Sequence, residues 1–339
     1  MIRRLCLAVL TVTLMQSVVV GVALAQSTGC TGLAIWYFPD PIPTGWICDL
    51  PGQGPYSMMC RVPNGLCPPV SWCPTCGKYV ASAGNPINLT NGNTYIQETD
   101  VKIPGLGGGL TLERTWNSIW PSIVSSLQPG MFGHNWRSTY EERIFPGSES
   151  SVNYIAYAKS DGGVWYFGPN NGSIWKLGAP ANTTATLTQN GTTSWTLTFQ
   201  NGEQRIFSYA SGSLMSIVDR NGNTTQLTYD GLNRLVTVTD PASRHLYFTY
   251  ASGSSGQVTG VSSDFGISLS YVYDAQNRLT QVTKPDSTTI SFAFNAQSLI
   301  TSVTDQNGKI LESHTYDGNG KGLTSSRALG VDAVTISYQ

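Results

Sequence analysis

The stretch Tyr229-Asp230-Gly231-Leu232-Asn233-Arg234-Leu235 returns further along the chain as Tyr273-Asp274-Ala275-Gln276-Asn277-Arg278-Leu279. Both copies belong to a series of aromatic markers with gaps of 20, 21, 23, 21, 22 and 22 residues: Tyr209, Tyr229, Tyr250, Tyr273, Phe294, Tyr316 and Tyr338. Aspartate follows three of the markers, as Asp230, Asp274 and Asp317. A period in this range is typical of one supersecondary unit stacked many times. Such repeats favour a scaffolding role, because they supply surface rather than a unique site.

A turn-forming residue precedes each marker at a nearly fixed distance. The distance is seven residues for Gly202, Gly222, Ser243, Gly266 and Ser287, and eight for Gly308 and Gly330. Between turn and marker, apolar residues alternate with polar ones, as in Leu246, Phe248 and Tyr250, which indicates a strand. After the marker, a loop leads to a second strand. We therefore expect two strands and two turns per unit, with an apolar face that one unit cannot bury alone.

The composition supports an all-β fold. The chain has 339 residues, 36 of them glycine, and helix-forming residues are sparse after the first 25. The net charge is -1 and only 12% of residues are charged, so the basic footprint of a nucleic-acid-binding protein is missing. We expect antiparallel strands throughout the repeat region and no nucleic-acid partner.

The N-terminus resembles an export signal. Arg3 and Arg4 precede a mostly apolar run that ends in Ala23-Leu24-Ala25, a small-residue cleavage site. We predict a signal peptide over residues 1–25 and a secreted or cell-surface protein. An uncleaved membrane anchor is the alternative, because the apolar run is about long enough to span a bilayer. A lipoprotein is less favoured, since no apolar residue precedes Cys30 closely.

Residues 26–78 form a segment rich in cysteine and proline. After removal of the signal the chain keeps six cysteines, all before residue 77: Cys30, Cys48, Cys60, Cys67, Cys73 and Cys76. In an exported protein an even, clustered set predicts structural disulfides, and six cysteines allow fifteen pairings. A zinc or redox role at Cys73-Pro74-Thr75-Cys76 is the alternative, but the motif has no second pair and no nearby histidine.

Two further regions complete the predicted organisation. Residues 79–150 contain strand patterns such as 95–103 and 110–116, and we assign them to a separate β domain. Residues 151–339 hold the repeats, introduced by Asn-Gly turn signals such as Asn190-Gly191 and Asn201-Gly202. The repeat region is expected to be incomplete at its C-terminal end, because the next unit would begin at Tyr338.

These motifs resemble a known family. The pattern Y-D-x-x-x-R-L at residues 229–235 and 273–279 is similar to the YD repeats of Rhs proteins. The segment from Gly84-Asn85-Pro86 to Gly133-His134-Asn135-Trp136 resembles the domain that precedes the repeats in bacterial Rhs and wall-associated polymorphic toxins. The resemblance covers residues 84–339. It implies a β-strip that spirals into a hollow shell around a C-terminal toxin-like payload, and here the payload or further repeats would be the missing partner.

The sequence offers no convincing catalytic group. His134, His245 and His314 are far apart, and each is expected to be a packed or surface residue. An aspartate that recurs in every unit is better suited to capping a turn than to catalysis. Arg234 and Arg278 are expected to pair with a neighbouring repeat's aspartate or to cover a tyrosine ring, rather than to form a ligand ladder. Glu141 and Glu142 are interpreted as a simple charge pair at a strand end.

The favoured function is therefore structural, with no enzyme activity, cofactor or metal. The alternative is a cell-surface module that binds carbohydrate or another envelope component through exposed aromatic rings. Its candidate stacking residues are Trp116, Trp120, Trp136, Trp165, Trp175 and Trp195. Because aromatic residues serve cores more often than glycan surfaces, we rank this hypothesis second and an enzyme third.

Overall fold

The computed structural model describes residues 33–37, 47–51, 57–61, 82–83, 86–89, 91–120, 127–149, 152–179, 184–251 and 256–338. Within these ranges the chain is all-β, as predicted. The helical elements that lie wholly inside them are short 3-10 turns, η1 (Leu106–Gly108) and η3 (Ala328–Gly330). None of the described helices is long and apolar enough to cross a membrane.

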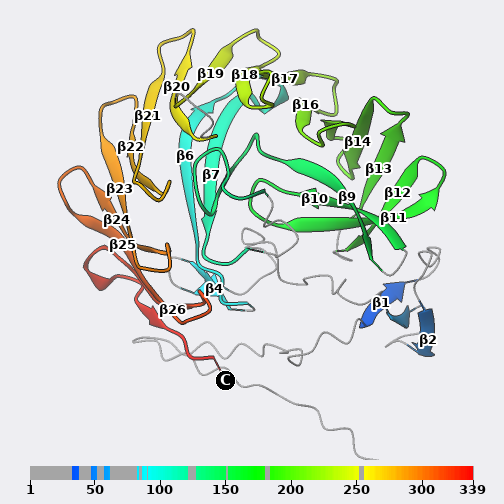
Figure 1. The fold of residues 1–339 in the computed structure, drawn as a ribbon, viewed down its shortest axis with the longest axis horizontal. Coiled ribbons are helices and arrows are strands. Elements are labelled where there is room, and N and C mark those ends of the chain that lie inside the picture. The colour runs from blue at the N-terminus through cyan, green and yellow to red at the C-terminus, as the bar shows by residue number, and fades with distance from the viewer. Residues whose placement is uncertain are drawn as a thin grey trace, which may run out of the picture.

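One antiparallel sheet of 19 strands, each beside its neighbour in sequence, makes up most of the molecule (Figure 1). Its strands are β9 (Arg143–Glu149), β10 (Val152–Ala158), β11 (Val164–Asn171), β12 (Ile174–Ala179), β13 (Ala185–Asn190), β14 (Ser194–Phe199), β15 (Gln204–Ser208), β16 (Leu214–Val218), β17 (Thr224–Tyr229), β18 (Leu235–Thr239), β19 (His245–Tyr250), β20 (Val258–Ser263), β21 (Ser268–Tyr273), β22 (Leu279–Thr283), β23 (Thr289–Phe294), β24 (Ile300–Asp305), β25 (Ile310–Tyr316), β26 (Gly322–Arg327) and β27 (Val334–Thr335). The predicted domain boundary at residue 150 falls inside the β9–β10 hairpin, whose two strands pair along their length.

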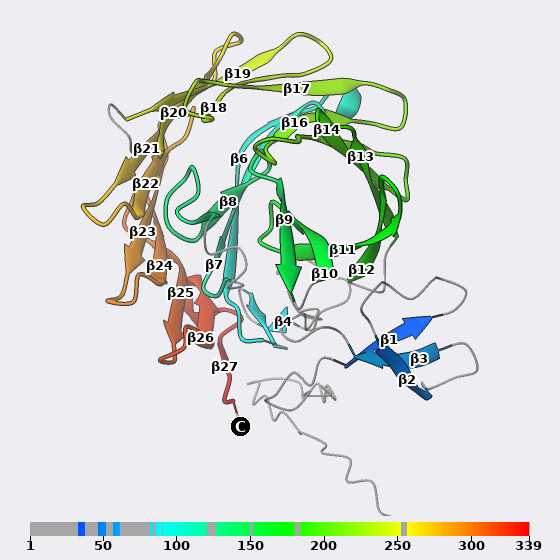
Figure 2. The same ribbon diagram turned by 45° about the vertical axis from the view of Figure 1, so that its right-hand side comes forward.

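The first eight strands, β9–β16, close into a ring, seen nearly end-on in Figure 2. Closure is made by an antiparallel bridge between Arg143 and Ser213, with the Ile144 amide donating to the Gly212 carbonyl at 3.0 Å. Aromatic side chains pack inside the ring. Tyr157, for example, is 1% exposed and makes edge contacts with Trp165 and Phe207.

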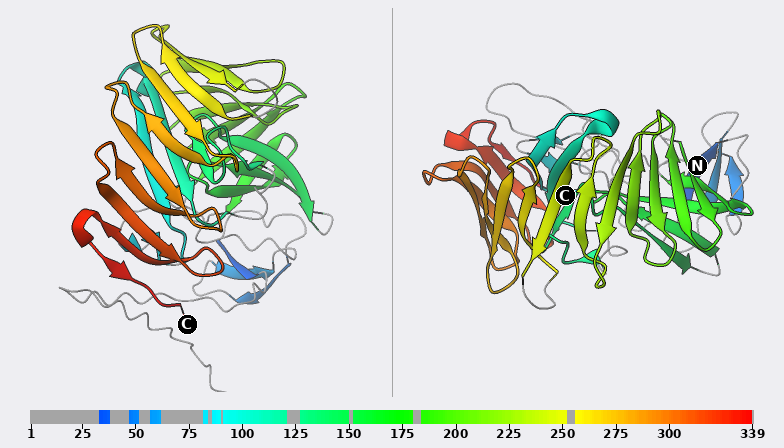
Figure 3. Two further views of the ribbon diagram at one scale, coloured as in Figure 1. Left: turned by 60° about the vertical axis from the view of Figure 1, so that its left-hand side comes forward. Right: turned by 90° about the horizontal axis from the view of Figure 1, so that it is seen from above.

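The remaining strands, β17–β27, form a curved strip that continues from the ring (Figure 3). The strip bends because its pairing shifts register at the marker residues. Thr228 faces Thr237 but Tyr229 faces Leu235, and the same shift recurs at Tyr250, Tyr273, Phe294 and Tyr316. Each shift is a β-bulge, and bulges bend a strand and increase its twist. A regular repeat of bulges therefore gives a regular curvature.

A separate three-stranded sheet lies against the concave side of the strip (Figures 1 and 2). It consists of β6 (Tyr95–Ile103), β7 (Leu110–Asn117) and β8 (Trp136–Ser138), and we call it the inner sheet. Its apolar residues share one core with those of the ring and the strip. Trp116 and Trp136 are 0% exposed. The concave side of this part of the strip is thus filled by the chain's own residues.

Two small sheets complete the described structure. One has the order β1 (Leu33–Tyr37), β3 (Ser57–Arg61), β2 (Ile47–Pro51), and the other pairs β4 (Ser82–Ala83) with β5 (Ile87–Asn88). In the first, Cys48 and Cys60 face each other across β2 and β3. The predicted signal peptide, Cys30, Cys67, Cys73 and Cys76 lie outside the described residues.

Candidate functional site

The markers join each repeat to the one before it. Each hydroxyl of Tyr229, Tyr250, Tyr273, Tyr316 and Tyr338 donates a hydrogen bond of 2.6–2.8 Å to a backbone carbonyl 15 or 16 residues earlier. That carbonyl belongs to the first residue of the preceding unit's second strand, or for Tyr229 to the first residue of β16. Burial raises the pKa of Tyr338 to about 12. Burial raises the pKa of the other four tyrosines as well, so these five residues are structural donors that remain protonated at neutral pH.

Two markers depart from this pattern. Tyr209 follows β15 of the ring, is 40% exposed and stacks on Trp195 with a centroid distance of 6.0 Å. Phe294 has no hydroxyl, and the Arg278 guanidinium lies 4.9 Å from its ring centroid. The aromatic ring is thus common to all seven units, whereas the hydroxyl bond is not.

The aspartates after the markers organise the turns. One Asp230 carboxylate oxygen accepts hydrogen bonds from the backbone amides of Leu232 and Arg234, and the other accepts from the Arg234 side chain. Asp274 makes the same three contacts with Gln276 and Arg278. Such local bonding from a short side chain is the mechanism of an Asx turn. The arginine thus pairs with the aspartate of its own repeat, and not with a neighbouring one.

Basic residues of these turns also contact the following repeat. The Arg234 guanidinium carbon lies 4.7 Å from the centroid of the Tyr250 ring, and the Lys321 ammonium lies 5.0 Å from that of Tyr338. Cations over aromatic faces contribute about 0.5–1 kcal/mol at exposed sites. The turn residues Gly202, Gly222, Ser243, Gly266, Ser287, Gly308 and Gly330 all adopt positive φ. The markers, aspartates and basic residues therefore form a ladder of structural contacts between successive units. Arg234 and Arg278 are engaged with protein groups rather than free for a ligand.

The contact between the strip and the inner sheet with its flanking residues, which include Phe132 and Tyr140, is mainly aromatic. Phe248 packs against Tyr140, Tyr271 against Phe132 and Phe292 against Trp136, with ring centroids 4.9–6.3 Å apart. These distances and the tilted or edge-on orientations are favourable for aromatic pairs. Hydrogen bonds also cross this interface: the Val258 and Gly322 amides donate to the Met131 and Gly92 carbonyls, and the Arg244 guanidinium donates to the Pro104 carbonyl.

A buried ion pair lies within this apolar interface. The Arg114 guanidinium donates to both carboxylate oxygens of Asp100, at 2.5 and 2.9 Å, and the two side chains are 1% and 0% exposed. The Tyr271 hydroxyl of the strip donates to the same carboxylate at 2.7 Å. Burial lowers the pKa of Arg114, but the Asp100 charge more than offsets this and holds it above its usual range. The Arg114 guanidinium therefore stays charged.

Two other polar groups lie near the same interface, Glu98 and His314. Glu98 of β6 lies 3.7 Å from the Lys284 ammonium of the strip, and burial raises the pKa of its carboxyl. His314, on β25, is 2% exposed, and its Nε2 lies 3.4 Å from Glu312. The Glu98–Lys284 contact joins the inner sheet to the strip, whereas the His314–Glu312 contact lies within β25, and neither forms the nucleophile and base pair that catalysis would need.

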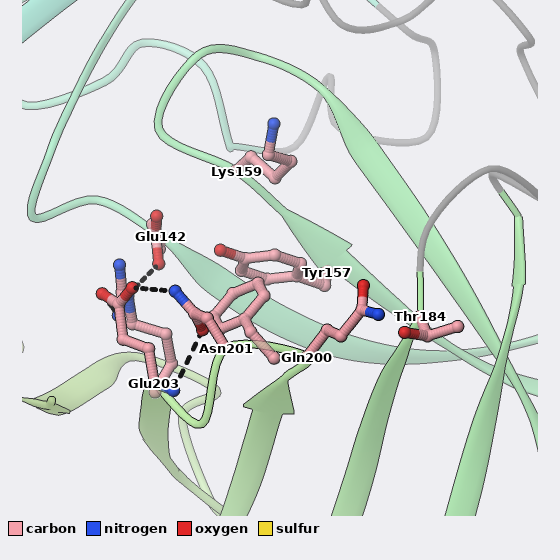
Figure 4. A pocket seen from close by; sticks show the side chains of 9 residues that line it. Glu142, Tyr157, Lys159, Thr184, Gln200, Asn201 and Glu203 are labelled. Atoms are coloured by element: carbon pink, nitrogen blue, oxygen red, sulfur yellow. Dashed lines mark hydrogen bonds and ion pairs between the residues drawn. The ribbon is translucent and has the colours of Figure 1, made fainter. Parts of the chain in front are cut away.

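A cavity of about 500 Å³ opens beside the β14–β15 turn of the ring (Figure 4). Arg205 joins two of its carboxylates, with Glu142 at 3.0 Å and Glu203 at 2.5 Å. The remaining lining residues are Tyr157, Lys159, Thr184, Phe199, Gln200 and Asn201. Burial, with a contribution from Glu142, raises the pKa of Tyr157 well above its ordinary value.

The cavity can hold a small molecule but offers little chemistry. Both carboxylates are bound to Arg205, and the neighbouring Tyr157 hydroxyl is held protonated by its burial. Within the described ranges no three histidine, cysteine, aspartate or glutamate side chains are grouped closely enough to hold a metal ion. Sequence reasoning missed Glu142, Arg205 and Tyr157 as partners, because they come from different strands and carry no motif.

The structure also places the residues weighed for other roles. His245 is partly exposed and bonds Asp264 at 2.8 Å, whereas His134 is exposed, so the three histidines do not meet. None of the six tryptophans proposed for glycan stacking is exposed. Glu141 and Glu142 do not act as one pair: Glu141 accepts from the Met131 amide and Glu142 pairs with Arg205. The six tryptophans therefore do not form an exposed stacking surface, and the exposed aromatic residues in the described part of the chain are instead Tyr209, Tyr247 and Phe265.

Family models match two parts of the chain. Residues 84–167 match a domain of unknown function, DUF6531. Residues 209–245 and 254–289 match the RHS Repeat. The first match covers the inner sheet and the start of the ring, and the second covers the repeats with the clearest Y-D-x-x-x-R-L motifs.

Curated relatives share part of this region. The tRNA nuclease WapA of Bacillus subtilis strain 168 and the tRNA3(Ser)-specific nuclease WapA of Bacillus spizizenii are each 26% identical over 156 residues, which is 44% of this chain. The chain spans only 6% of the length of these relatives. Among solved structures, TcdB2-TccC3 without its hypervariable C-terminal region aligns with a TM-score of 0.29 and 10% identity, covering 70% of this chain and 15% of that one. A Tc holotoxin pore of Photorhabdus luminescens aligns with a TM-score of 0.28 and 13% identity, covering 73% and 14%.

Proposed function

This chain belongs to the Rhs/YD-repeat family, and we propose that it is an exported structural protein whose ring and strip form part of the wall of an Rhs-type β-shell around a C-terminal payload. On this proposal the described residues carry out no chemistry of their own. They exclude water and other proteins from what lies against the concave side. The payload would be a toxin-like domain or a further polypeptide of the shell.

One observation supports the proposal: the concave face of the strip already packs against a separate sheet of the chain, the inner sheet. The inner sheet has its largest side chains, Trp116 and Trp136, fully buried against the strip and the segment that precedes β9. The strip buries these side chains with one face of its short repeated units. Additional repeats would therefore extend the covering surface without requiring a new fold. A continuous antiparallel sheet also leaves few unpaired edges along its length, which limits edge-to-edge aggregation.

The test is limited proteolysis of the protein as its gene encodes it, produced in a bacterial host. We expect the ring and strip to resist protease together with a second polypeptide, either C-terminal to Gln339 or co-purified. That polypeptide should become sensitive only when urea unfolds the strip. A resistant strip with no protected companion would contradict the enclosing role.

Export is tested separately. We propose cleavage after Ala25, so N-terminal sequencing of protein recovered outside the cytoplasm should begin at Gln26. We also propose that the cysteines of residues 26–78 form disulfides, as expected for an even, clustered set in an exported protein. Non-reducing peptide mapping should recover cross-linked cysteine peptides. Cytoplasmic protein with an intact N-terminus would contradict the first proposal, and free thiols at all six cysteines the second.

A further inference from the structure

The apolar contacts of the inner sheet do not distinguish one repeat of the strip from the next. The residue two positions before each marker points into the core, and it is 0–7% exposed in every unit: Phe207, Leu227, Phe248, Tyr271, Phe292, His314 and Ile336. Most of these side chains are apolar. Because apolar burial is non-directional, a sheet resting on such a surface gains similar stabilisation at neighbouring units. Polar contacts can distinguish the repeats: Arg244–Pro104 and Glu98–Lys284 do so outside this set of residues, and within the set the distinction requires a polar side chain.

Tyr271 differs from the other six residues in this set because it brings a hydroxyl to the core. The hydroxyl donates to Asp100 at 2.7 Å, and the Tyr271 ring centroid lies 5.5 Å from the Arg114 guanidinium carbon. Trp136 and Phe132, from the inner-sheet side, approach the same guanidinium at 4.7 and 5.6 Å. A buried ion pair loses much stability when a bonding partner is withdrawn, since its remaining lone pairs cannot reach water.

The backbone of the inner sheet is shaped to present this pair. Thr99 faces Glu113 and Val101 faces Leu112, which leaves Asp100 as the extra residue of a β-bulge. Bulges redirect a side chain that regular alternation would place elsewhere. Both Asp100 and Val101 are consequently buried, although they are adjacent in one strand. The bulge thus turns Asp100 toward the strip without exposing Val101.

We propose that Tyr271 is the residue that determines where the inner sheet sits on the strip, and that its hydroxyl is recognised by the buried Asp100–Arg114 pair. At a neighbouring repeat the pair would face Phe248 or Phe292 and would lose a donor. Buried polar groups retained for positional specificity rather than stability have precedent in coiled coils, where a single polar residue fixes register. The inference does not depend on a payload, so it can hold even if the enclosing role is contradicted.

The first experiment compares two tyrosines of the same strand, β21, in the full chain. Tyr271→Phe removes the hydroxyl bonded to the inner sheet, and Tyr273→Phe removes the one bonded to Val258 of the strip itself. Hydrogen exchange read by mass spectrometry should show β6–β8 amides exchanging roughly tenfold faster in Tyr271→Phe, the scale of one lost bond to a charged group. In Tyr273→Phe the increase should instead fall on β20 and β21. The same exchange pattern in both variants would overturn the proposal.

A second experiment separates positioning from stability. The triple variant Asp100→Leu, Arg114→Met, Tyr271→Phe replaces the polar contact with apolar groups, a change that often preserves or raises stability. A photo-crosslinking phenylalanine derivative at Leu106, which is 63% exposed at the tip of the inner sheet, reports its position. In the otherwise unmodified chain it should cross-link peptides containing Asn223 or Pro241, which lie 3.2–3.5 Å from a Cβ built on Gly107.

The triple variant should melt within a few degrees of the parent and yet cross-link to the turns of additional repeats. Cross-links confined to the Asn223 and Pro241 peptides would show that apolar contacts and chain connectivity suffice, and would overturn the proposal. The photo-crosslinker in the Tyr273→Phe background is the matched control, and it should give the parental peptides alone.

Discussion

The ring and the strip are built from the same antiparallel hairpins, yet they bury their apolar faces in different ways. The ring closes on itself at the Arg143–Ser213 bridge and fills its interior with its own aromatic residues. The strip stays open, and part of its concave face is covered by the inner sheet. A closed ring of hairpins can bury its apolar face against itself. An open strip of hairpins needs another polypeptide to cover its apolar face. The stability of the strip should therefore depend on the inner sheet far more than that of the ring does.

The largest expected effect comes from withdrawing Arg114. Arg114→Ala leaves the Asp100 carboxylate buried without its partner, a change that typically costs about 3–5 kcal/mol. Because Asp100 contacts the strip through Tyr271, the loss should appear first in β20–β24. Hydrogen exchange during a urea titration should show these strands opening while β9–β16 remain protected. Simultaneous opening of ring and strip would contradict the difference drawn between them.

The next effect concerns closure of the ring. Gly212 has a φ of +70°, and a Cβ built on it lies 1.9 Å from the Ile144 carbonyl. Gly212→Ala should therefore open the closing bridge and destabilise by more than the roughly 1–2 kcal/mol of left-handed strain alone. Gly222 of the strip, with a φ of +86° and no heavy atom within 4 Å of its Cβ, is the matched control. Gly222→Ala should lose only the stability that left-handed strain accounts for, as measured by urea denaturation. Equal losses of stability in the two variants would contradict a stabilising role for the closing bridge.

Acid should destabilise the strip before the ring, because their turns are built differently. Several ring turns rest on Asn-Gly pairs such as Asn190-Gly191, whereas most strip turns are capped by an aspartate such as Asp240 or Asp274. Burial raises the pKa of these carboxyls, but hydrogen bonds from Arg244 and Arg278 outweigh it, so their pKa lies below the ordinary 3.8. A depressed folded pKa gives stability that is complete above pH 3.8 and is lost as the pH falls through the folded value. The strip should therefore lose protection before the ring in that window, and Asp274→Asn should reduce the difference.

Glu98 of the inner sheet should have the opposite effect on the pH dependence of stability. Burial raises its pKa above 4.5, so the stability linked to it increases as the pH falls from neutrality through the raised value toward 4.5. A thermal melting series should show a maximum between the two windows. Glu98→Gln should flatten the neutral side of that maximum and leave the acid side unchanged. A parental curve with no rise below neutrality would contradict the burial of Glu98.

The smallest effect is expected at Ser243. This residue and Ser287 adopt φ values of 58° and 67° at turn positions that most other repeats fill with glycine. Ser243→Gly relieves the left-handed strain but increases the entropy of the unfolded chain, so a net stabilisation of about 0.5 kcal/mol is expected. Ser213 of the ring provides the contrast, because it is buried at the closing bridge and its hydroxyl accepts a bond from Asn233 at 3.1 Å. Ser213→Gly should destabilise, and chemical denaturation measures both changes.

Much of the strip was predictable because its information is local. The residues placed before each marker as turns do adopt positive φ, and alternation located strands such as β19 and β21 correctly. The curved antiparallel sheet and the family also follow from the repeat. The ring closure was not predictable, since Arg143 and Ser213 meet only after six intervening strands have set the curvature.

The functional contacts were less predictable than the fold. Regular alternation in residues 95–103 conceals the bulge that buries Asp100 beside Val101. Tyr271 looks like any other apolar-face residue of a repeat until its partner on the inner sheet is known. The cavity residues Glu142 and Arg205 are distant in sequence and carry no spacing rule. Long-range pairing of this kind depends on tertiary geometry, which a periodic pattern does not encode.

The tyrosine bonds between successive repeats have a consequence for how such a protein evolves. Each hydroxyl reaches only the unit immediately before it, so a repeat carries its complete set of connections within two neighbouring units. A duplicated segment of one whole period would arrive with both the donor and the acceptor that it needs. Genes for such strips can therefore grow or shrink by recombination in steps of about 21–23 residues without loss of the ladder, which makes the length of the enclosure an easily inherited variable.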